Sequence, residues 1–114
     1  MNERGGLILV TDETFEREVI RSPLPVVVDF YADWCGPCRA FEPLLREISE
    51  SLAGQIKFTK VNVDDADRVT RSFGIHSIPT YLFVDRGKEK GREVGAVAQT
   101  TEFRTILERY FSFV

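Results

Sequence analysis

The stretch that decides the fold is Pro25-Val26-Val27-Val28-Asp29-Phe30-Tyr31-Ala32-Asp33-Trp34-Cys35-Gly36-Pro37-Cys38-Arg39. Its first eight residues are almost continuously apolar, a pattern typical of a central parallel strand that is covered on both faces. Glycine and proline then form a turn, and from Phe41 to Leu52 apolar residues recur at helical spacing. We therefore expect a buried strand that ends at a turn carrying the only two cysteines of the chain, where a helix begins.

Similar patterns divide the rest of the chain into alternating strands and helices. We expect further strands at residues 7–10, 55–63, 80–84 and 88–97, and further helices that begin near residues 12, 65 and 100. Thr11 or Asp12 is the expected cap of the first of these helices. Asp85-Arg86-Gly87 carries a hairpin signature. This order predicts a mixed α/β sheet with a parallel first half.

The composition bounds the organisation of the chain and its partners. With 114 residues and 43% apolar content, we expect one domain over residues 1–114, of which residues 1–6 form a flexible tail. Residues 7–10 are too short an apolar run for a signal peptide, and no stretch approaches membrane-spanning length. We expect a soluble, cytoplasmic monomer. Its net charge of −3 gives no general attraction to nucleic acid or acidic membranes.

Cys35 and Cys38 point to redox chemistry rather than to structure. A bridge over two residues closes too small a loop to stabilise the fold much. Two buried small side chains would not explain Cys-Gly-Pro-Cys at a strand-to-helix junction. A closed zinc site needs about four ligands, whereas the chain offers two cysteines and His76. We expect no metal and no bound cofactor, only a redox-active disulfide between the two cysteines.

The position of Cys35 at the start of a helix makes it the expected attacking sulfur, because the free amides and the helix dipole favour its thiolate. Cys38, one turn further on, is expected to be turned inward and to be the resolving thiol. Cys35 would attack a substrate disulfide to form a mixed disulfide, and Cys38 would then attack Cys35 and release the reduced substrate. Gly36 and Pro37 stiffen the turn and space the thiols.

Asp29 is the second informative residue, because a carboxylate inside this apolar strand is expected to be buried whichever face it points to. Burial raises the pKa of a carboxyl group. We expect Asp29 to lie beneath the thiols and to accept the proton of Cys38, directly or through water. It is also a candidate for a structural pair with Lys60, whose strand parity with Phe58 directs its stem inward. The two interpretations are compatible.

Other residues near the cysteines are more ambiguous. Trp34 belongs either to the core or to a docking surface beside the nucleophile. His76 is expected to be an exposed loop residue without a chemical role. Sequence alone says little about the isomer of the Ile78-Pro79 bond.

The chain resembles the thioredoxin family from about Leu7 to Tyr110. The resemblance rests on the segment 29–39 and on a set of further matches at consistent spacings: Pro43, Lys60-Val61-Asn62-Val63-Asp64, Gly74-Ile75, Ile78-Pro79-Thr80, Gly87 and Val94-Gly95-Ala96. It implies a thioredoxin fold, in which a single mixed sheet of four or five strands with an antiparallel C-terminal hairpin is flanked by four helices.

The resemblance also implies a function and a set of site residues. The implied activity is that of a general protein disulfide reductase, whose partners are a thioredoxin reductase that recycles it and client proteins that carry disulfides. The implied catalytic set is Cys35, Cys38, Asp29 and Lys60. The residues expected to contact docked polypeptide are Trp34, Gly36, Pro37, Ile78, a cis Pro79 that faces the cysteines, Gly95 and Ala96.

Three positions depart from the family pattern. Tyr31 stands where many members carry a second tryptophan, Arg39 where lysine is frequent, and His76-Ser77 where Arg-Gly is common. These departures are expected to affect partner choice or reduction potential and to leave the catalytic groups in place.

Two functions from different classes fit the sequence. The first is a protein disulfide reductase. The alternative is an adaptor or subunit that uses the same fold to bind proteins and does not need its thiols. The complete set of Cys35, Cys38, Asp29 and Pro79 favours the enzyme, and Gly-Pro between the cysteines resembles reductants rather than oxidases or isomerases.

Overall fold

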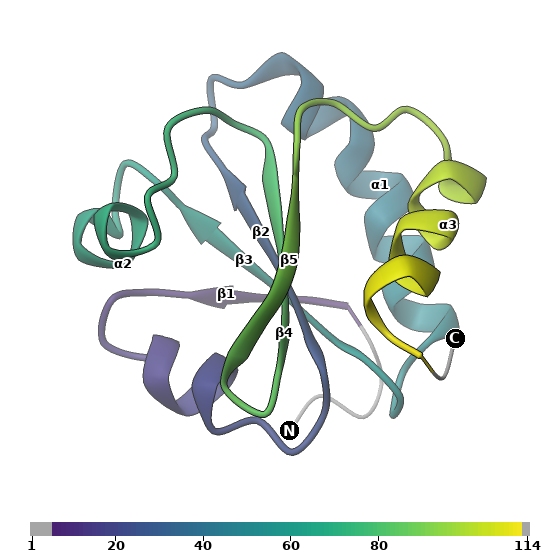
Figure 1. The fold of residues 1–114 in the computed structure, drawn as a ribbon. Coiled ribbons are helices and arrows are strands. Elements are labelled where there is room, and N and C mark those ends of the chain that lie inside the picture. Colours follow the sequence, from purple (N-terminus) through teal and green to yellow (C-terminus); the bar gives the residue numbers. More distant parts are fainter. Residues whose placement is uncertain (1–5, 113–114) are drawn as a thin grey trace.

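The computed structural model describes residues 6–112, which form a five-stranded sheet flanked by helices (Figure 1). Along the chain the elements are β1 (Leu7–Val10), the π-helical turn η1 (Glu16–Ile20), β2 (Val26–Tyr31), α1 (Gly36–Ser51), β3 (Lys57–Asn62), α2 (Asp67–Ser72), β4 (Thr80–Asp85), β5 (Lys88–Val94) and α3 (Thr100–Tyr110). The predicted order of strands and helices is confirmed. The flexible tail expected at residues 1–6 lies, apart from Gly6, outside the described residues.

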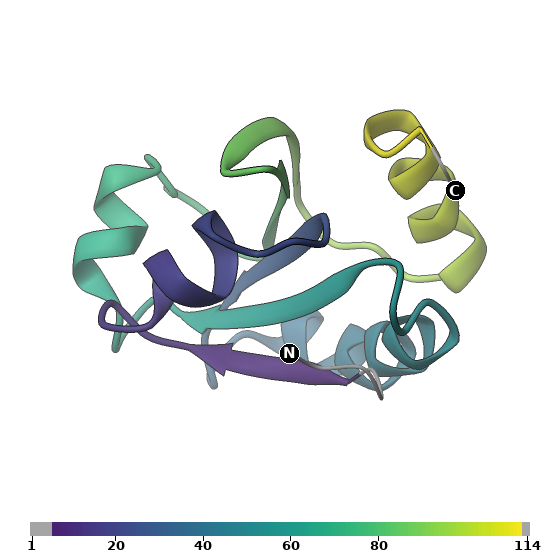
Figure 2. The same cartoon turned by 90° about the horizontal axis from the view of Figure 1, so that it is seen from below.

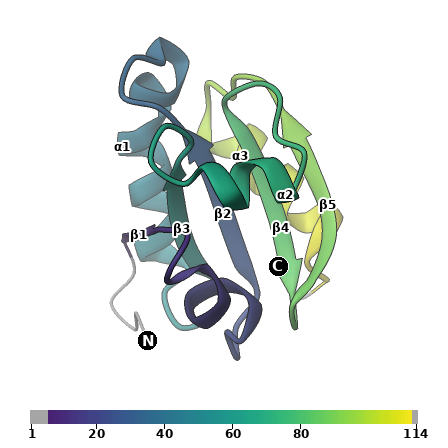
Figure 3. The same ribbon diagram turned by 90° about the vertical axis from the view of Figure 1, so that its left-hand side faces the viewer.

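The strands follow one another across the sheet in the order β1-β3-β2-β4-β5, as Figure 3 shows. β1 and β2 run parallel to β3, whereas β4 runs antiparallel to β2 and β5 antiparallel to β4. The mixed sheet with a parallel first half and an antiparallel C-terminal hairpin is therefore confirmed. Because β2 is the central strand, the turn that follows it emerges at the middle of the sheet edge.

Two apolar cores lie on opposite faces of the sheet. α1 and α3 cover one face, and η1 and α2 cover the other (Figure 2). Alternation along β2 separates the two cores: Val27 packs under α1 and α3, whereas Val26, Val28 and Phe30 pack on the other side. Asp29 has the parity of Val27, so β2 directs its carboxyl group toward the face that α1 covers.

The hairpin between β4 and β5 has the predicted turn. Arg86 and Gly87 both adopt positive φ angles, of 54° and 77°, as a two-residue type I′ turn requires. Gly87 also lies close to η1, since a Cβ atom there would be 3.1 Å from the carbonyl oxygen of Ile20. A larger residue at this position would both strain the turn and push the hairpin away from η1.

Two strand boundaries differ from the sequence-based expectation. β3 begins at Lys57 rather than at residue 55, because the amides of residues 55 and 56 donate to the Leu52 carbonyl, at 3.0 and 3.1 Å, in the turn after α1. β5 ends at Val94 rather than at residue 97, because Gly95 turns the chain with a φ of 111°. In both places the apolar pattern continues beyond the strand. Apolar residues there pack into the core without forming strand-to-strand hydrogen bonds.

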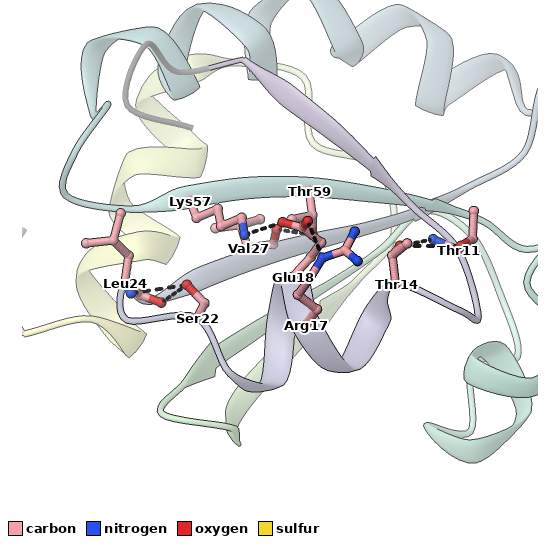
Figure 4. A network of polar contacts seen from close by, with 9 residues as sticks. All are labelled: Thr11, Thr14, Arg17, Glu18, Ser22, Leu24, Val27, Lys57 and Thr59. Carbon is pink, nitrogen blue, oxygen red and sulfur yellow. Dashed lines mark hydrogen bonds and ion pairs between the residues drawn. The ribbon is translucent and has the colours of Figure 1, made fainter. Parts of the chain in front are cut away.

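The expectation that Thr11 or Asp12 caps η1 is wrong. η1 has no side-chain cap, and Thr14 Oγ1 accepts a hydrogen bond from the Thr11 amide at 2.9 Å (Figure 4). The Asp12 carboxylate instead accepts from the amides of Arg68 and Val69, at 3.2 and 2.8 Å. These amides belong to the first turn of α2 and have no partner within the helix. Asp12 therefore ties the segment after β1 to α2.

The end of the sheet opposite the cysteines contains a buried ion pair. Lys57 is the first residue of β3, pairs in register with Val26, and is only 6% exposed. Its Nζ donates to Glu18 Oε1 at 2.6 Å, and Arg17 pairs with the same carboxylate at 3.1 Å (Figure 4). The hydrogen bond from Lys57 lowers the pKa of Glu18. The buried ammonium group therefore has a charged partner.

Candidate active site

The two cysteines lie where β2 gives way to α1. Cys35 is the N-cap residue of α1, with an extended backbone (φ −84°, ψ 108°), and its Sγ accepts a hydrogen bond from the Cys38 amide at 3.2 Å. The two residues form a disulfide, and their Cα atoms are 5.3 Å apart. The expected disulfide at a helix N-terminus is therefore present. In the reduced protein, the free amides and the dipole of α1 favour the thiolate of Cys35.

The surroundings of the disulfide are apolar. Both cysteines are 5% exposed, so exposure does not distinguish the attacking from the resolving sulfur. They pack with a small set of residues from the end of β2, the residue after it, the segment after β3 and the segment before β4: Tyr31, Ala32, Val63 and Ile78. The assignment of attack to Cys35 and resolution to Cys38 stays a prediction, which rests on the N-cap position of Cys35.

Pro79 and Gly95 meet at the ends of β4 and β5 that lie near the cysteines. The Ile78–Pro79 peptide bond is cis, as the resemblance implied. The Gly95 amide donates to the Pro79 carbonyl at 2.9 Å. Gly95 has a φ of 111°, which residues with a Cβ rarely adopt, while the space that a Cβ would fill is open. Glycine is therefore needed here for its backbone conformation.

Two shallow pockets adjoin these residues and include the other residues expected to bind polypeptide. One, of about 420 Å³, is lined by Trp34, Val63, Thr70, Ile75, His76, Ser77 and Ile78. The other, of about 200 Å³, is lined by Pro37, Ala40, Phe41, Ala96, Val97 and Ala98. Gly36 has open space where a Cβ would lie. His76 is exposed, as expected, but it borders the first pocket.

Trp34 belongs to the surface rather than to the core. Its side chain is 70% exposed, and its Nε1 donates to Asp64 Oδ2 at 2.9 Å. Asp64 comes from the segment after β3, so this hydrogen bond holds the exposed indole across two parts of the chain. A large amphipathic ring fixed in this way beside a disulfide suits protein docking.

Asp29 is buried, as predicted. It is 4% exposed, and within residues 6–112 its Oδ1 has no hydrogen-bond partner. Burial, supported by the negative charge of Glu42 and opposed by Lys60, raises the pKa of Asp29 from 3.8 to about 7. Tyr81 of β4 lies opposite Asp29 in register, and burial together with the Asp29 charge raises the pKa of its hydroxyl group. Asp29 can therefore gain or lose a proton near neutral pH.

The structural pair for which Lys60 was a candidate partner of Asp29 does not form. The two residues are partners in the β2–β3 register, but Lys60 Nζ pairs with Glu42 Oε2 at 3.4 Å and lies 5.1 Å from the centre of the Tyr31 ring. Glu42 lies on α1 one turn after Cys38, and its carboxylate reaches the ammonium group from the helix side. Lys60 therefore acts on Asp29 only through its charge.

Sequence reasoning missed three residues of this region. Glu42 binds Lys60, Tyr81 lies opposite Asp29, and Asp64 holds Trp34. A sequence signal existed only for Glu42, which follows Cys38 at the i, i+4 spacing that places two helical residues on one face. Tyr81 and Asp64 meet their partners through strand pairing and a long-range contact.

The described part of the chain contains no candidate metal site and no helix that could span a membrane. Within residues 6–112, no three His, Cys, Asp or Glu side chains are grouped so that they could hold a metal ion. Within the same residues, no helix is long and apolar enough to cross a membrane.

Comparison with known proteins identifies the family of this chain. The Thioredoxin family model matches residues 6–109. The chain belongs to the thioredoxin family. It is 46% identical to Thioredoxin 1 of Nostoc sp. over 97 residues, which cover 85% of this chain and 91% of that protein. It is 44% identical to a thioredoxin of Rickettsia felis over 75% of this chain and 82% of that protein. It is 42% identical to a chloroplastic M-type thioredoxin of Brassica napus over 84% of this chain and 54% of that protein.

Family membership and geometry together establish the class of chemistry. The thioredoxin fold expected from the sequence is confirmed. Because a thioredoxin with a Cys35–Cys38 pair at disulfide distance exchanges its dithiol for a disulfide, the protein is a protein-disulfide oxidoreductase and has the function of a disulfide reductase.

Proposed function

We propose that this protein reduces disulfides in a range of other proteins and that a thioredoxin reductase restores its dithiol. The observation that carries the proposal is the Cys35–Cys38 disulfide at the N-terminus of α1, beside the exposed Trp34. The proposed site of action is the cytoplasm, whose reducing conditions keep the dithiol available. We propose that the protein acts there as a monomer.

The proposed reaction has two exchanges. The Cys35 thiolate attacks one sulfur of the client disulfide, forms a mixed disulfide and releases the other client sulfur as a thiolate. Cys38 then loses its proton, and its thiolate attacks the Cys35 sulfur. The bond between Cys35 and the client breaks, the second client sulfur leaves as a thiolate, and the Cys35–Cys38 disulfide forms. The client gains two electrons and this protein loses two.

The client is proposed to dock over the surface around the disulfide. Trp34 and Ile78 border one shallow pocket, and Pro37 and Ala96 border the other. The cis Pro79 and Gly95 join the ends of β4 and β5 near the cysteines. Backbone and apolar contacts of this kind recognise an extended polypeptide with little regard to its sequence, which suits a reductase that acts on many clients.

Asp29 is proposed to accept the proton of Cys38 during the second exchange. Its buried carboxyl group has a pKa of about 7, so near neutral pH a fraction of the molecules holds the carboxylate that this step requires. A base whose pKa lies nearer to that of a thiol accepts the thiol proton at a smaller energetic cost than an ordinary carboxylate does. Lys60 is proposed to assist through its positive charge.

Insulin reduction by the wild-type protein, thioredoxin reductase and NADPH tests the function. We expect the wild type to reduce insulin, and the Cys35→Ser variant to show no activity because it cannot form the mixed disulfide. Cys38→Ser should accumulate a mixed disulfide through Cys35, since attack occurs without resolution. Equal activity of the wild type and Cys35→Ser would instead support the adaptor function.

The role of Asp29 has a separate test. We expect Asp29→Asn to slow resolution of a preformed mixed disulfide, by up to about a hundredfold near neutral pH, because the internal base is lost. Binding of the client should change much less. Single-turnover rates between pH 6 and pH 8 measure this step, and equal rates for the two proteins across that range would remove Asp29 from the mechanism.

A further inference from the structure

Glu42 occupies a position beside the active site that the mechanism has not used. It lies on α1 one turn after Cys38, on the same side of the helix. Its Oε2 is 3.4 Å from Lys60 Nζ and 2.9 Å from a guanidinium nitrogen of Arg46. Cys38, Lys60 and Glu42 also line one pocket of about 380 Å³. Glu42 therefore shares a pocket with the resolving cysteine and pairs with the lysine that is the register partner of Asp29.

The pairing of Glu42 with Lys60 leaves the Asp29 carboxyl group without a cation in direct contact. Lys60 is the register partner of Asp29 on β3. Its ammonium group pairs with the helix carboxylate instead, and Asp29 Oδ1 has no hydrogen-bond partner. A buried carboxylate without a hydrogen bond or an ion pair is strongly disfavoured relative to the neutral acid.

The groups that face Asp29 come from each element packed against it. β3 supplies Lys60 and β4 supplies Tyr81, which are the register partners of Asp29, and α1 supplies Glu42, whose charge acts on Asp29. Among the charged groups, Glu42 raises the pKa of Asp29 and Lys60 lowers it, both by less than burial raises it. Tyr81 is neutral near pH 7, because burial raises the pKa of its hydroxyl group further above its ordinary value of 10. Within residues 6–112, the charges that shift the pKa of Asp29 are therefore those of Glu42 and Lys60.

We propose that Glu42 is a positioning residue for the resolving step: it holds the Lys60 ammonium group away from Asp29 and adds a negative charge nearby, and both effects favour the protonated form of the Asp29 carboxyl group. The inference rests on the proposed role of Asp29 as the acceptor of the Cys38 proton. Glu42 touches no reacting atom. It acts by bringing the proton affinity of Asp29 closer to that of a thiol, which is the condition for efficient proton transfer between them.

Titration of the Asp29 carboxyl carbon by NMR tests the inference directly. The oxidised protein is used, since neither cysteine titrates in the disulfide and the curve reports Asp29 alone. We expect Glu42→Gln, which keeps the size of the side chain and removes its charge, to lower the pKa of Asp29 by about one unit. Glu47→Gln is the matched control, because Glu47 is an exposed acid on the same helix, and it should leave the titration unchanged. An unchanged Asp29 titration in Glu42→Gln would overturn the proposal.

A second background separates the two ways in which Glu42 acts. Lys60→Met removes the cation, so Glu42→Gln in that background removes only the direct repulsion of Asp29. We expect a smaller fall in the Asp29 pKa there than in the wild type. An equal fall in both backgrounds would overturn the part of the proposal that concerns Lys60.

Kinetics then connect the titration to the resolving step. In Glu42→Gln, the pH at which resolution reaches half of its maximal rate should fall together with the Asp29 pKa. A fall in the Asp29 pKa with no change in this midpoint would overturn the proposed effect on resolution. This result differs from a failure of the proposed function, in which the wild type itself does not reduce insulin or Asp29→Asn resolves mixed disulfides at the wild-type rate.

Discussion

Each end of the sheet contains a buried ionisable side chain, and the two side chains differ in whether they have a charged partner. Lys57, at the start of β3, is 6% exposed and pairs with Glu18 at 2.6 Å. Asp29, near the end of β2 that leads to the cysteines, is 4% exposed and has an oxygen with no partner. Glu18 neutralises the charge of Lys57, whereas the Asp29 carboxyl group responds to burial by a change in its protonation.

This difference separates a structural from a functional use of burial. Lys57 lowers the pKa of its partner Glu18, so the buried ammonium group faces a carboxylate at neutral pH. Burial raises the pKa of Asp29 to about 7, so its charge changes in the range where the protein works. A site that must move a proton needs a group of the second kind, and the cation that would neutralise Asp29 is bound to Glu42.

The largest expected effect on stability comes from Asp29→Asn at alkaline pH. The folded state binds the Asp29 proton more tightly than the unfolded state, so the contribution of this group to stability is fully present below pH 3.8 and is lost as pH rises toward about 7. A tenfold change in an acid constant corresponds to about 1.4 kcal/mol. Ionisation of Asp29 in the folded state therefore lowers the free energy of unfolding by about 4 kcal/mol. Denaturant unfolding of the oxidised proteins should show the Asp29→Asn variant more stable than the wild type by about this amount at pH 8 and nearly equal to it at pH 4. A pH-independent difference would contradict the interpretation.

Replacement at the other end should have a somewhat smaller effect of opposite sign. Glu18→Gln leaves the buried Lys57 ammonium group without its carboxylate, and we expect a loss of about 3 kcal/mol in the free energy of unfolding at pH 7. Because the folded-state pKa of Glu18 is lowered, its contribution is present above the ordinary value of 4.5 and is lost as pH falls through the folded-state pKa. Denaturant unfolding at pH 7 and pH 3 measures both points.

The matched control for this prediction is Glu16→Gln. Glu16 lies on the same turn, is exposed, and makes a pair of 3.5 Å with the exposed Arg21. We expect a change below about 1 kcal/mol at pH 7. Equal losses for Glu16→Gln and Glu18→Gln would show that the buried pair has no special role.

The sequence predicts these two ends unequally. Asp29 is visible as a carboxylate inside an apolar run, and its burial, its strand and its place before the cysteines could all be predicted. Lys57 was placed in a strand, but its partner Glu18 is 39 residues away on a turn that the pattern described only as a helix. No local signal indicates that this turn crosses β3 at Lys57.

The absence of a local signal for long-range contacts also explains why the sequence did not reveal the partner of Lys60. Strand parity correctly placed Lys60 on the inner face beside Asp29, since Phe58 packs in the core under α1 and α3. What parity does not contain is the rotation of α1 over the sheet, which brings Glu42 onto the ammonium group. Contacts within one element, or between paired strands, follow from periodicity. Contacts between a helix and the sheet beneath it depend on packing of the whole core.

The smallest expected effect comes from replacing the far pair as a unit. In the double variant Lys57→Met and Glu18→Leu, no charge remains buried and the volumes are nearly kept, so we expect a free energy of unfolding within about 1 kcal/mol of the wild type, or above it. Lys57→Met alone should lose more than the double variant, because Glu18 would keep its charge with the exposed Arg17 as its remaining partner. Denaturant unfolding of the wild type, Lys57→Met, Glu18→Leu and the double variant completes the cycle. A double variant as unstable as Glu18→Gln would show that the pair stabilises the fold through more than mutual neutralisation, and the contrast with Asp29 would then be one of degree.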